Sequence, residues 1–594
     1  MAQAPLAMPG LAGADPQKTI LARAIAACRR QFVAVGLFSL IANILQLTVS
    51  IYMMQVFDRV LATRSIDTLI FLTLLAGACL LLLALLEPAR SQILQRCSAW
   101  IEGCVAPETF SRVIEAQLRN RPYRMEAMRD LATCRGFVAS PGMTVLYDVP
   151  WVPVYLAVIF VLHPLLGWIA LAGAALLFVL TLANEYATAA LLKKANIAAM
   201  QLQRRTDSVV RNAEVIDSMG MMPQLMQRWR EGQSKVGPDQ QRAADRAGLV
   251  LATTKFFRLA VQLLLLAVGA LLVLHQELTG GAMIAGSIIM GRALAPVEQM
   301  IGTWKQVVAA RQSWRRLNQN LALPRIRPRG MPLPPPDGRL AAERVTYAFP
   351  GTSQAIIKGV GFTLEPGESC AIIGPSAAGK TTLVRLLIGT IEPQAGTVRL
   401  DGANVFTWLR EDFGRYVGYL PQDVELFDGS VFDNIARMGR AEPEAVYAAA
   451  RLCGAHEMIL RLPKGYDTEI GEGGTFLSGG QRQMVGMARA MFGNPRFVVL
   501  DEPNSNLDGE GEQALLRALE QLKAGGTTVV LVSHRPALVQ GVDKVMVLRD
   551  GALEMFGARA EVMKRLMAPA AAAPRPAAVA GPDAPRIEDR RAAP

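Results

Sequence analysis

The stretch Leu477-Ser-Gly-Gly-Gln-Arg-Gln483 is followed closely by Phe497-Val-Val-Leu-Asp-Glu502, and together they decide how the second half of the chain folds. The first is a glycine-rich turn that opens into a helix, and the free N–H groups of a helix N-terminus form an anion site. The second is an apolar strand that delivers Asp501 and Glu502 to its C-terminal edge. One carboxylate in such a place usually serves a metal ion, and the other can serve a water molecule.

A third motif lies upstream, where Gly374-Pro-Ser-Ala-Ala-Gly-Lys-Thr381 matches the phosphate-loop pattern G-x-x-x-x-G-K-[ST]. In such a loop the backbone amides and the lysine hold phosphates, and the hydroxyl after the lysine ligates Mg²⁺. Many ATPases carry this loop alone. The order and spacing of all three motifs, however, resemble the ATPase domain of an ABC transporter. The resemblance implies an α/β P-loop domain that uses ATP and Mg²⁺ and couples ATP hydrolysis to transmembrane transport.

Three residues are assigned to catalysis by this resemblance: Glu502, Gln422 and His534. Glu502 is expected to be the general base that polarises the attacking water. Gln422, in Tyr419-Leu-Pro-Gln422, is expected to reach Mg²⁺ or that water, and His534 to contact the γ-phosphate. A lone histidine is usually structural, but this one follows an apolar strand in the order that the family shows.

The expected nucleotide contacts come from the phosphate loop, the signature and one aromatic ring. Phe349 precedes a proline at the position where the family stacks an aromatic ring on adenine, and Tyr347 is the alternative. The expected cofactor-binding residues are Phe349, Gly374, Pro375, Ser376, Ala377, Ala378, Gly379, Lys380, Thr381, Thr382, Ser478, Gly479, Gly480, Gln481 and Asp508. The expected metal ligands are Thr381, Gln422 and Asp501. Asn506 stands where the family usually has Ala, which leaves the cross-talk between two sites open.

The composition indicates a chain that is partly embedded in a membrane. Of its 594 residues, 51% are hydrophobic and 19% charged, against about 25% charged in an average soluble domain. The formal net charge of +12 is compatible with nucleic-acid binding, but the Arg and Lys residues cluster between apolar runs, as in cytoplasmic loops. We therefore expect no nucleic-acid partner. The scattered cysteines support neither a zinc site nor a disulfide framework, and no cleavable signal peptide is evident.

Six apolar stretches are long enough to cross a bilayer. They are about 32–57, 69–86, 145–162, 165–182, 249–274 and a weaker one at 282–301. The long connections 88–140 and 192–247 are rich in arginine, whereas the other links are short and carry few positive charges. The positive-inside rule therefore places both termini and the ATPase in the cytoplasm, which requires an even number of crossings. The polar residues Asn43, Gln46, Ser50 and Gln55 in the first span suit either helix packing or a polar lumen.

The membrane half resembles one subgroup of ABC half-exporters, the type I secretion ATPases that export metalloproteases (the PrtD-like group). The motifs that carry this resemblance are Tyr52-Met-Met-Gln-Val-Phe-Asp-Arg-Val-Leu61, Asp148-Val-Pro-Trp151, Arg211-Asn-Ala-Glu-Val-Ile-Asp-Ser-Met-Gly220 and Arg292-Ala-Leu-Ala-Pro-Val-Glu-Gln299. The resemblance implies export of an unfolded polypeptide with an uncleaved C-terminal signal. Its expected partners are a periplasmic adaptor protein, an outer-membrane duct and the lipids of a bacterial inner membrane. Because the first span starts near residue 32, we expect no N-terminal peptidase domain.

Five segments are expected on these grounds. They are a disordered N-terminus (1–16), a transmembrane domain with an amphipathic elbow helix and six spans (17–312), a linker (313–338), an ABC nucleotide-binding domain (339–566) and a disordered tail (567–594). The tips of the long loops, near Met125–Phe137 and Ala213–Met222, are candidate coupling helices. In ABC ATPases the signature caps the nucleotide of a second domain, so a chain with one ATPase domain is expected to form a homodimer with two active sites.

Two other functions share some of these features. A lipid or drug half-exporter would have every ATPase motif and differ only in its membrane half. A soluble DNA-repair ATPase of the SMC kind also carries the signature, but it would have coiled-coil heptads where this chain has spans.

Overall fold

The computed structural model describes residues 19–119, 125–210, 212–327, 330–352 and 354–567. The chain forms two compact units, residues 1–325 and 326–594. The segment expected to be disordered at the N-terminus (1–16), and all of the expected tail except Met567, lie outside the described residues.

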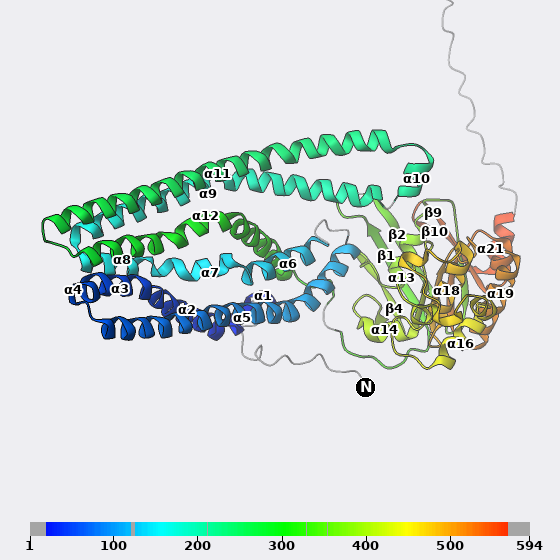
Figure 1. Ribbon diagram of the computed structural model, residues 1–594. Helices are drawn as coiled ribbons and strands as arrows, with labels where there is room; N and C mark the ends of the chain where they lie inside the picture. The colour runs from blue at the N-terminus through cyan, green and yellow to red at the C-terminus, as the bar shows by residue number, and fades with distance from the viewer. Residues whose placement is uncertain (1–18, 120–124, 211, 328–329, 353, 568–594) are drawn as a thin grey trace, which may run out of the picture. The chain divides into compact units, whose positions relative to one another are not determined.

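The first unit is built from helices (Figure 1). They are α1 (Ile20–Ala27), α2 (Arg29–Leu45), α3 (Thr48–Gln55), the π-helix η1 (Val56–Val60), α4 (Leu61–Thr63), α5 (Ile66–Leu118), α6 (Glu126–Val138), α7 (Pro141–Asp148), η2 (Val149–Trp151), α8 (Val152–Leu162), α9 (Pro164–Val210), α10 (Ala213–Ser218), α11 (Met222–Leu274) and α12 (Gly280–Ala322). Within the described ranges, six helical stretches are long and apolar enough to cross a membrane. The predicted six-span fold is therefore confirmed.

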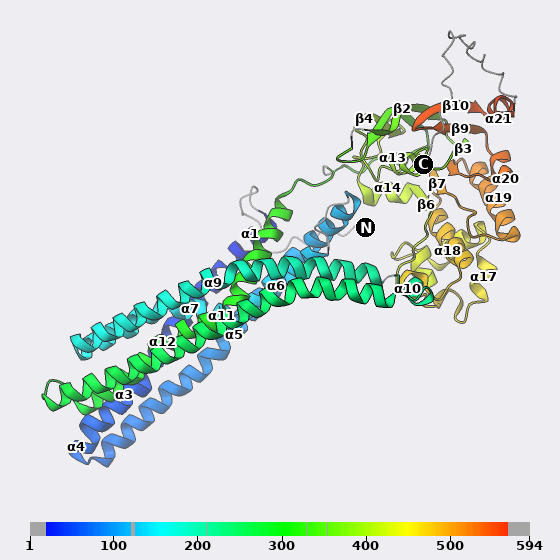
Figure 2. The same cartoon turned by 90° about the horizontal axis from the view of Figure 1, so that it is seen from above.

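Four of the expected spans are the apolar parts of the longer helices α5, α9, α11 and α12, whereas the first and third are divided among several shorter helices. Helices α9 and α11 run side by side well beyond the length that a bilayer requires (Figures 1 and 2). The elbow helix α1 lies against α5, and Leu21 and Ala24 are buried there. The long connections between the spans are thus largely helical.

The sixth span is a continuous helix in spite of its weak hydropathy. Helix α12 contains Pro296, and it packs against α3, α6, α8, α9 and α11. More than half of its apolar window is buried, a larger share than in the other spans. Small residues such as Ala285 and Ala293 allow this close packing. The residues that lower its hydropathy therefore suit a helix surrounded by protein instead of lipid.

The first candidate coupling helix packs within the helical unit. Helix α6 packs against α5 and α12, with Ala127 and Leu131 almost completely buried. Arg316 of α12 binds Asp130 of α6 through two hydrogen bonds of 2.6 and 2.9 Å. The link between α5 and α6 includes residues 120–124, which lie outside the described residues. The second candidate contains the short helix α10.

The second unit holds a mixed six-stranded sheet with the strand order β10-β9-β3-β8-β7-β6. These strands are β3 (Ser369–Ile373), β6 (Val417–Leu420), β7 (Phe497–Asp501), β8 (Thr528–Val532), β9 (Lys544–Arg549) and β10 (Ala552–Ala558). All neighbours are parallel except β9 and β10. Phe497 and Val499 face one buried core, and Val498 and Leu500 face the other. An all-apolar strand is expected when a parallel sheet is covered on both faces.

A smaller antiparallel sheet has the order β2-β1-β4-β5. Its strands are β1 (Leu340–Ala348), β2 (Ala355–Leu364), β4 (Ala395–Leu400) and β5 (Ala403–Asn404). The helices of this unit are α13 (Lys380–Leu387), α14 (Arg410–Tyr416), α15 (Val431–Ile435), α16 (Pro443–Leu452), α17 (His456–Leu460), η3 (Gly465–Asp467), η4 (Glu472–Gly474), α18 (Gly479–Met491), α19 (Gly509–Ala524), α20 (Pro536–Gln540) and α21 (Arg559–Met567).

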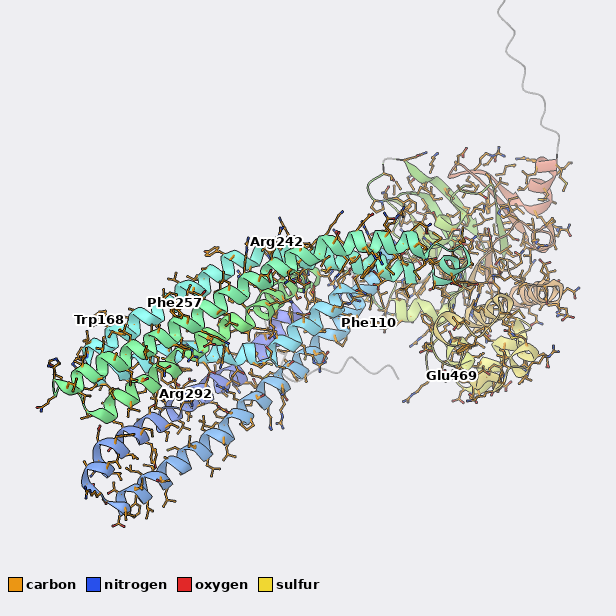
Figure 3. All side chains as sticks on the ribbon, turned by 45° about the horizontal axis from the view of Figure 1, so that its top comes forward. Phe110, Trp168, Arg242, Phe257, Arg292 and Glu469 are labelled. Atoms are coloured by element: carbon orange, nitrogen blue, oxygen red, sulfur yellow. The ribbon has the colours of Figure 1, made fainter. Side chains whose placement is uncertain are left out.

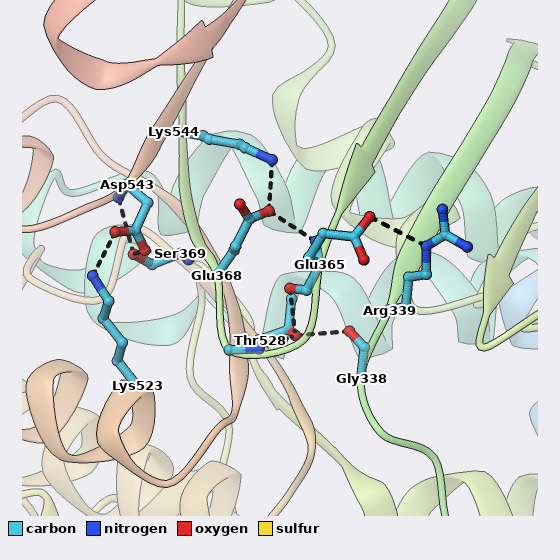
Figure 4. Close-up of polar contacts among 10 residues, drawn as sticks. Gly338, Arg339, Glu365, Glu368, Ser369, Lys523, Thr528, Asp543 and Lys544 are labelled. Atoms are coloured by element: carbon cyan, nitrogen blue, oxygen red, sulfur yellow. Dashed lines mark hydrogen bonds and ion pairs between the residues drawn. The ribbon is translucent and has the colours of Figure 1, made fainter.

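Polar contacts fix the strand ends opposite the phosphate loop (Figure 4). The Thr528 hydroxyl, at the start of β8, donates to the Gly338 carbonyl at 2.7 Å. Asp543 accepts from the Ser369 backbone at 3.0 Å and from Lys523 at 2.5 Å. Burial would raise the pKa of Asp543, but the bonds from Lys523 and Ser369 outweigh it and lower that pKa. These contacts hold strands from distant parts of the sequence in register.

Candidate nucleotide site

The phosphate loop connects β3 to α13, so it ends at a helix N-terminus. The backbone there needs glycine at two positions. Gly374 has φ +155°, and a Cβ on it would collide with the Leu548 carbonyl; Gly379 has φ +96°, and a Cβ would come within 2.9 Å of Ile357. The N–H groups of the first turn of α13 have no partner inside the helix and can donate hydrogen bonds to an anion. This part of the expected site has the geometry of a phosphate cradle.

Lys380 folds back over the loop. Its Nζ donates to the carbonyls of Gly374 at 2.8 Å and Pro375 at 3.0 Å. Burial lowers the pKa of Lys380, and the nearby carboxylates of Glu502 and Asp501 act in the opposite direction. The ammonium therefore lies at the mouth of the loop, where it can exchange its carbonyl partners for phosphate oxygens.

Asp501 is a buried carboxylate with too few hydrogen-bond donors. Neither of its buried oxygens makes a hydrogen bond of regular geometry among the described residues, although the Thr381 hydroxyl lies close enough to act on the carboxyl group. Burial raises its pKa, and the Thr381 hydroxyl and the charges of Arg385 and Lys380 partly oppose that rise. An unsatisfied buried carboxylate is costly unless a cation compensates it. Its position beside Thr381 therefore fits a Mg²⁺ ion, whose preferred ligands are oxygen atoms.

The three residues expected to act in catalysis come together at one edge of the sheet. Gln422 follows β6, Glu502 follows β7 and His534 follows β8, and these strands are adjacent and parallel. The Gln422 Nε2 donates to Glu502 Oε2 at 3.1 Å, and His534 Nε2 lies 4.0 Å from Glu502 Oε1. Glu502 has φ +50°, a conformation that is uncommon for residues other than glycine. Such strain is typical of residues that are held for a function.

The signature begins helix α18 through a capping box. The Ser478 hydroxyl accepts from the Gln481 backbone at 3.3 Å, and the Gln481 side chain accepts from the Ser478 backbone at 2.8 Å. Gly480 lies against the next motif, because a Cβ there would come within 2.9 Å of the Asn506 carbonyl. The signature and the loop after Asp501 therefore form one continuous surface within the chain.

Two aromatic residues at the end of β1 differ in exposure. Phe349 is 49% exposed, whereas Tyr347 packs against the buried core of this unit. Their rings meet edge to face at 5.8 Å. The Phe349 ring is therefore accessible for stacking on a base, and Tyr347 packs against it.

Two residues have structural roles that were not predicted from the sequence. Asp508, expected to contact nucleotide, is the N-cap of α19, and its Oδ1 accepts from the Gly511 backbone at 2.8 Å. An Asp before an acidic first turn was the available signal. Arg90, read only as a positive loop charge, is buried and pairs with Asp148 at 2.8 Å in the membrane unit. The sequence gives no sign of that pairing, because the two residues lie far apart.

Comparisons with known proteins agree with this geometry. Residues 357–505 match the family described as ABC transporter, and residues 32–295 match the ABC transporter transmembrane region. The chain is 41% identical to the type I secretion system ATP-binding protein PrsD of Rhizobium meliloti, over 94% of this chain and 95% of the relative. It is 29% identical to the cyclolysin secretion/processing protein CyaB of Bordetella pertussis, over 88% of this chain and 74% of the relative.

The fold also matches a solved structure. A bacterial Atm1-family ABC exporter with ATP bound superposes with a TM-score of 0.79 at 21% identity, covering 91% of this chain and 97% of the other. At this identity the likeness concerns the fold alone.

Proposed function

Since this chain belongs to the ABC transporters, in the group of type I secretion ATP-binding proteins, we propose that it exports an unfolded polypeptide bearing an uncleaved C-terminal signal. The chain is a multi-pass membrane protein and an ATPase coupled to transport. The observation that supports the polypeptide as cargo most directly is the 41% identity to a type I secretion protein over nearly the whole length of both chains.

The site residues support ATP hydrolysis by a positioned base. Glu502 lies between Gln422 and His534, and each of these can hold one of its two carboxylate oxygens. Glu502 would accept a proton from the attacking water, and Gln422 would orient that water. Lys380 and the first turn of α13 would hold the phosphates, and Phe349 would stack on the adenine. Mg²⁺, held by Asp501 and Thr381, would neutralise the charge of the phosphates.

We propose that the working unit is a homodimer. Within the described ranges, the Ser478 hydroxyl hydrogen-bonds only to the Gln481 backbone of the same capping box. The exposed N-terminus of α18 is therefore available to a nucleotide bound on a second copy. Two such contacts, related by two-fold symmetry, would complete two active sites.

The exporter would lie in a bacterial inner membrane, with both termini and the ATPase in the cytoplasm. The arginine-rich long connections support this orientation. Its partners would be a periplasmic adaptor and an outer-membrane duct. A pull-down with the full-length chain tests this: a periplasmic adaptor should co-purify when cargo is present. Recovery of the intact dimer without any periplasmic protein, together with ATPase stimulation by lipids or hydrophobic drugs alone, would support a small-molecule exporter instead.

A further inference from the structure

A polar cavity of about 620 Å³ lies inside the membrane unit, and the nucleotide site does not use it. Its wall comes from α2, α5, α7 and α12. Two of its charged residues, Asp148 and Arg292, open motifs that are typical of the protease exporters. Ionisable residues within membrane-spanning helices are costly and usually mark a substrate or ion pathway. This cavity is therefore a candidate for contact with cargo.

One wall of the cavity is a closed polar network. The Asp148 Oδ1 accepts hydrogen bonds from Arg90 at 2.8 Å, from Asn43 at 2.9 Å and from Ser39. The Tyr155 hydroxyl in turn donates to the Asn43 side-chain oxygen at 3.0 Å. Arg90 and Asp148 compensate each other's charge, and both are largely buried. The polar groups of this network have partners without any ligand. The network therefore shapes the cavity but adds no net charge to it.

A second group of side chains in the cavity lining is available to a ligand. Arg292 and Gln299 of α12, with Glu87 and Gln95 of α5, line the same cavity. All four are exposed, and within the described ranges their side chains make no ion pair or hydrogen bond. Figure 3 labels Arg292 on α12, on the part of that helix that lines the cavity. The cavity lining contains two arginines. Arg90 is already paired with Asp148, whereas Arg292 is not paired with a carboxylate among the described residues.

The chemistry of these available side chains favours a peptide ligand. A guanidinium binds a carboxylate through two parallel hydrogen bonds, and side-chain amides can pair with the backbone of an extended chain. Glu87 would repel a second anion, so one carboxylate beside Arg292 is the favoured arrangement. A lipid headgroup could also supply an anion, but its acyl chains need an apolar groove, and the lining of this cavity is mostly polar.

We propose that Arg292 binds a carboxylate of the exported polypeptide while an extended segment of that polypeptide lies along the amide groups of the cavity. This site rests on the proposed function, because it assigns a carboxylate-recognising residue to that export route.

Fluorescence anisotropy with the full-length protein in lipid nanodiscs tests the site. The probes are a short fluorescein-labelled peptide of Gly, Ser and Leu that contains Asp, and the same peptide with Asn in place of Asp. The wild type should prefer the Asp peptide. Arg292→Gln should weaken Asp-peptide binding by about tenfold and leave Asn-peptide binding unchanged. Arg292→Lys should retain part of the preference.

Arg311→Gln is the matched control, because Arg311 is an exposed arginine of the same helix that does not line this cavity. Equal binding of the two peptides by the wild type, or an equal loss in the Arg292→Gln and Arg311→Gln variants, would overturn the proposal. Displacement of the Asp peptide by phosphatidylglycerol in the nanodisc would assign the site to a lipid instead. A separate export assay with the wild-type protein distinguishes the two hypotheses. If cargo is still exported in any of these cases, only the Arg292 site is rejected; if no cargo is exported, the proposed function is rejected.

Discussion

Gln422 donates a hydrogen bond from its side-chain amide to Glu502, with 3.1 Å between Nε2 and Oε2. The two residues lie far apart in the sequence, but they follow adjacent parallel strands, β6 and β7. Because the carboxyl ends of parallel strands meet at one edge of the sheet, residues that follow them gather in the same place. The contact holds the expected base in position.

Replacing Glu502 by glutamine should abolish turnover and leave ATP binding intact. The amide keeps the size of the side chain but cannot accept a proton, and loss of a positioned base typically lowers the rate by about 10²–10⁴-fold. The measurement is steady-state ATPase activity alongside equilibrium ATP binding. Near-wild-type turnover in the purified variant would remove Glu502 from this role.

Lys380→Ala should act on binding instead. The substitution removes the cation that lies at the mouth of the phosphate loop, so ATP should bind more weakly. Isothermal titration of ATP into the variant measures the effect, with Glu502→Gln as the control that keeps its affinity. ATP binding as tight as in the wild type would contradict the assignment of Lys380.

A linked dimer tests whether the sites are shared between two chains. With Ser478→Arg in one copy and Lys380→Ala in the other, both lesions should fall on the same nucleotide and leave one complete site. With both lesions in one copy and a wild-type partner, each site should carry one lesion. The first arrangement should therefore retain more ATPase activity than the second.

The control for this experiment is the linked wild-type dimer, which sets the activity of two complete sites. Equal activity in the two lesion arrangements would contradict the head-to-tail dimer.

The buried pair of Arg90 and Asp148 should matter for stability. Arg90→Met leaves a largely buried carboxylate without its cation, which in soluble proteins costs about 3–5 kcal/mol. The double variant Arg90→Met/Asp148→Asn removes both charges and should recover much of that loss. Thermal unfolding in detergent should rank the wild type first, the double variant second and the single variant last.

The exposed pair of Arg451 and Glu444 serves as the comparison, with side chains 54% and 73% exposed. Arg451→Met should change stability by about 0–1 kcal/mol. If Arg451→Met and Arg90→Met lowered the stability equally, burial would not increase the contribution of the Arg90–Asp148 pair to stability.

The sequence predicted those features that depend on short, contiguous patterns. Glycine positions and apolar runs determine the local backbone conformation. The conformation could therefore be predicted from the sequence for the phosphate loop, the signature and the strand before Glu502. The Ser478 capping box was also readable, since Ser followed three residues later by Gln is a recognised helix start. The six spans followed from their length, although the boundaries did not, because the helices continue beyond their apolar parts.

Features that depend on packing between distant segments were not predictable. The burial of Arg90 requires Asp148 from another helix, and a single positive charge near the end of a span gives no indication of such a partner. The packing of α6 was likewise not predictable, because its contacts with α12 come from residues far along the chain. The sequence predicted the sixth span despite its weak hydropathy, but it did not predict the close packing of α12, for the same reason.

Export of a defined cargo tests the central claim most directly. The purified protein would be reconstituted with its adaptor and duct, supplied with ATP, and given cargo either with or without its C-terminal segment. The proposed function predicts that intact cargo emerges at full length and that cargo lacking the segment stays inside, with neither exported by the Glu502→Gln variant. Secretion that ignores the C-terminal segment would contradict it.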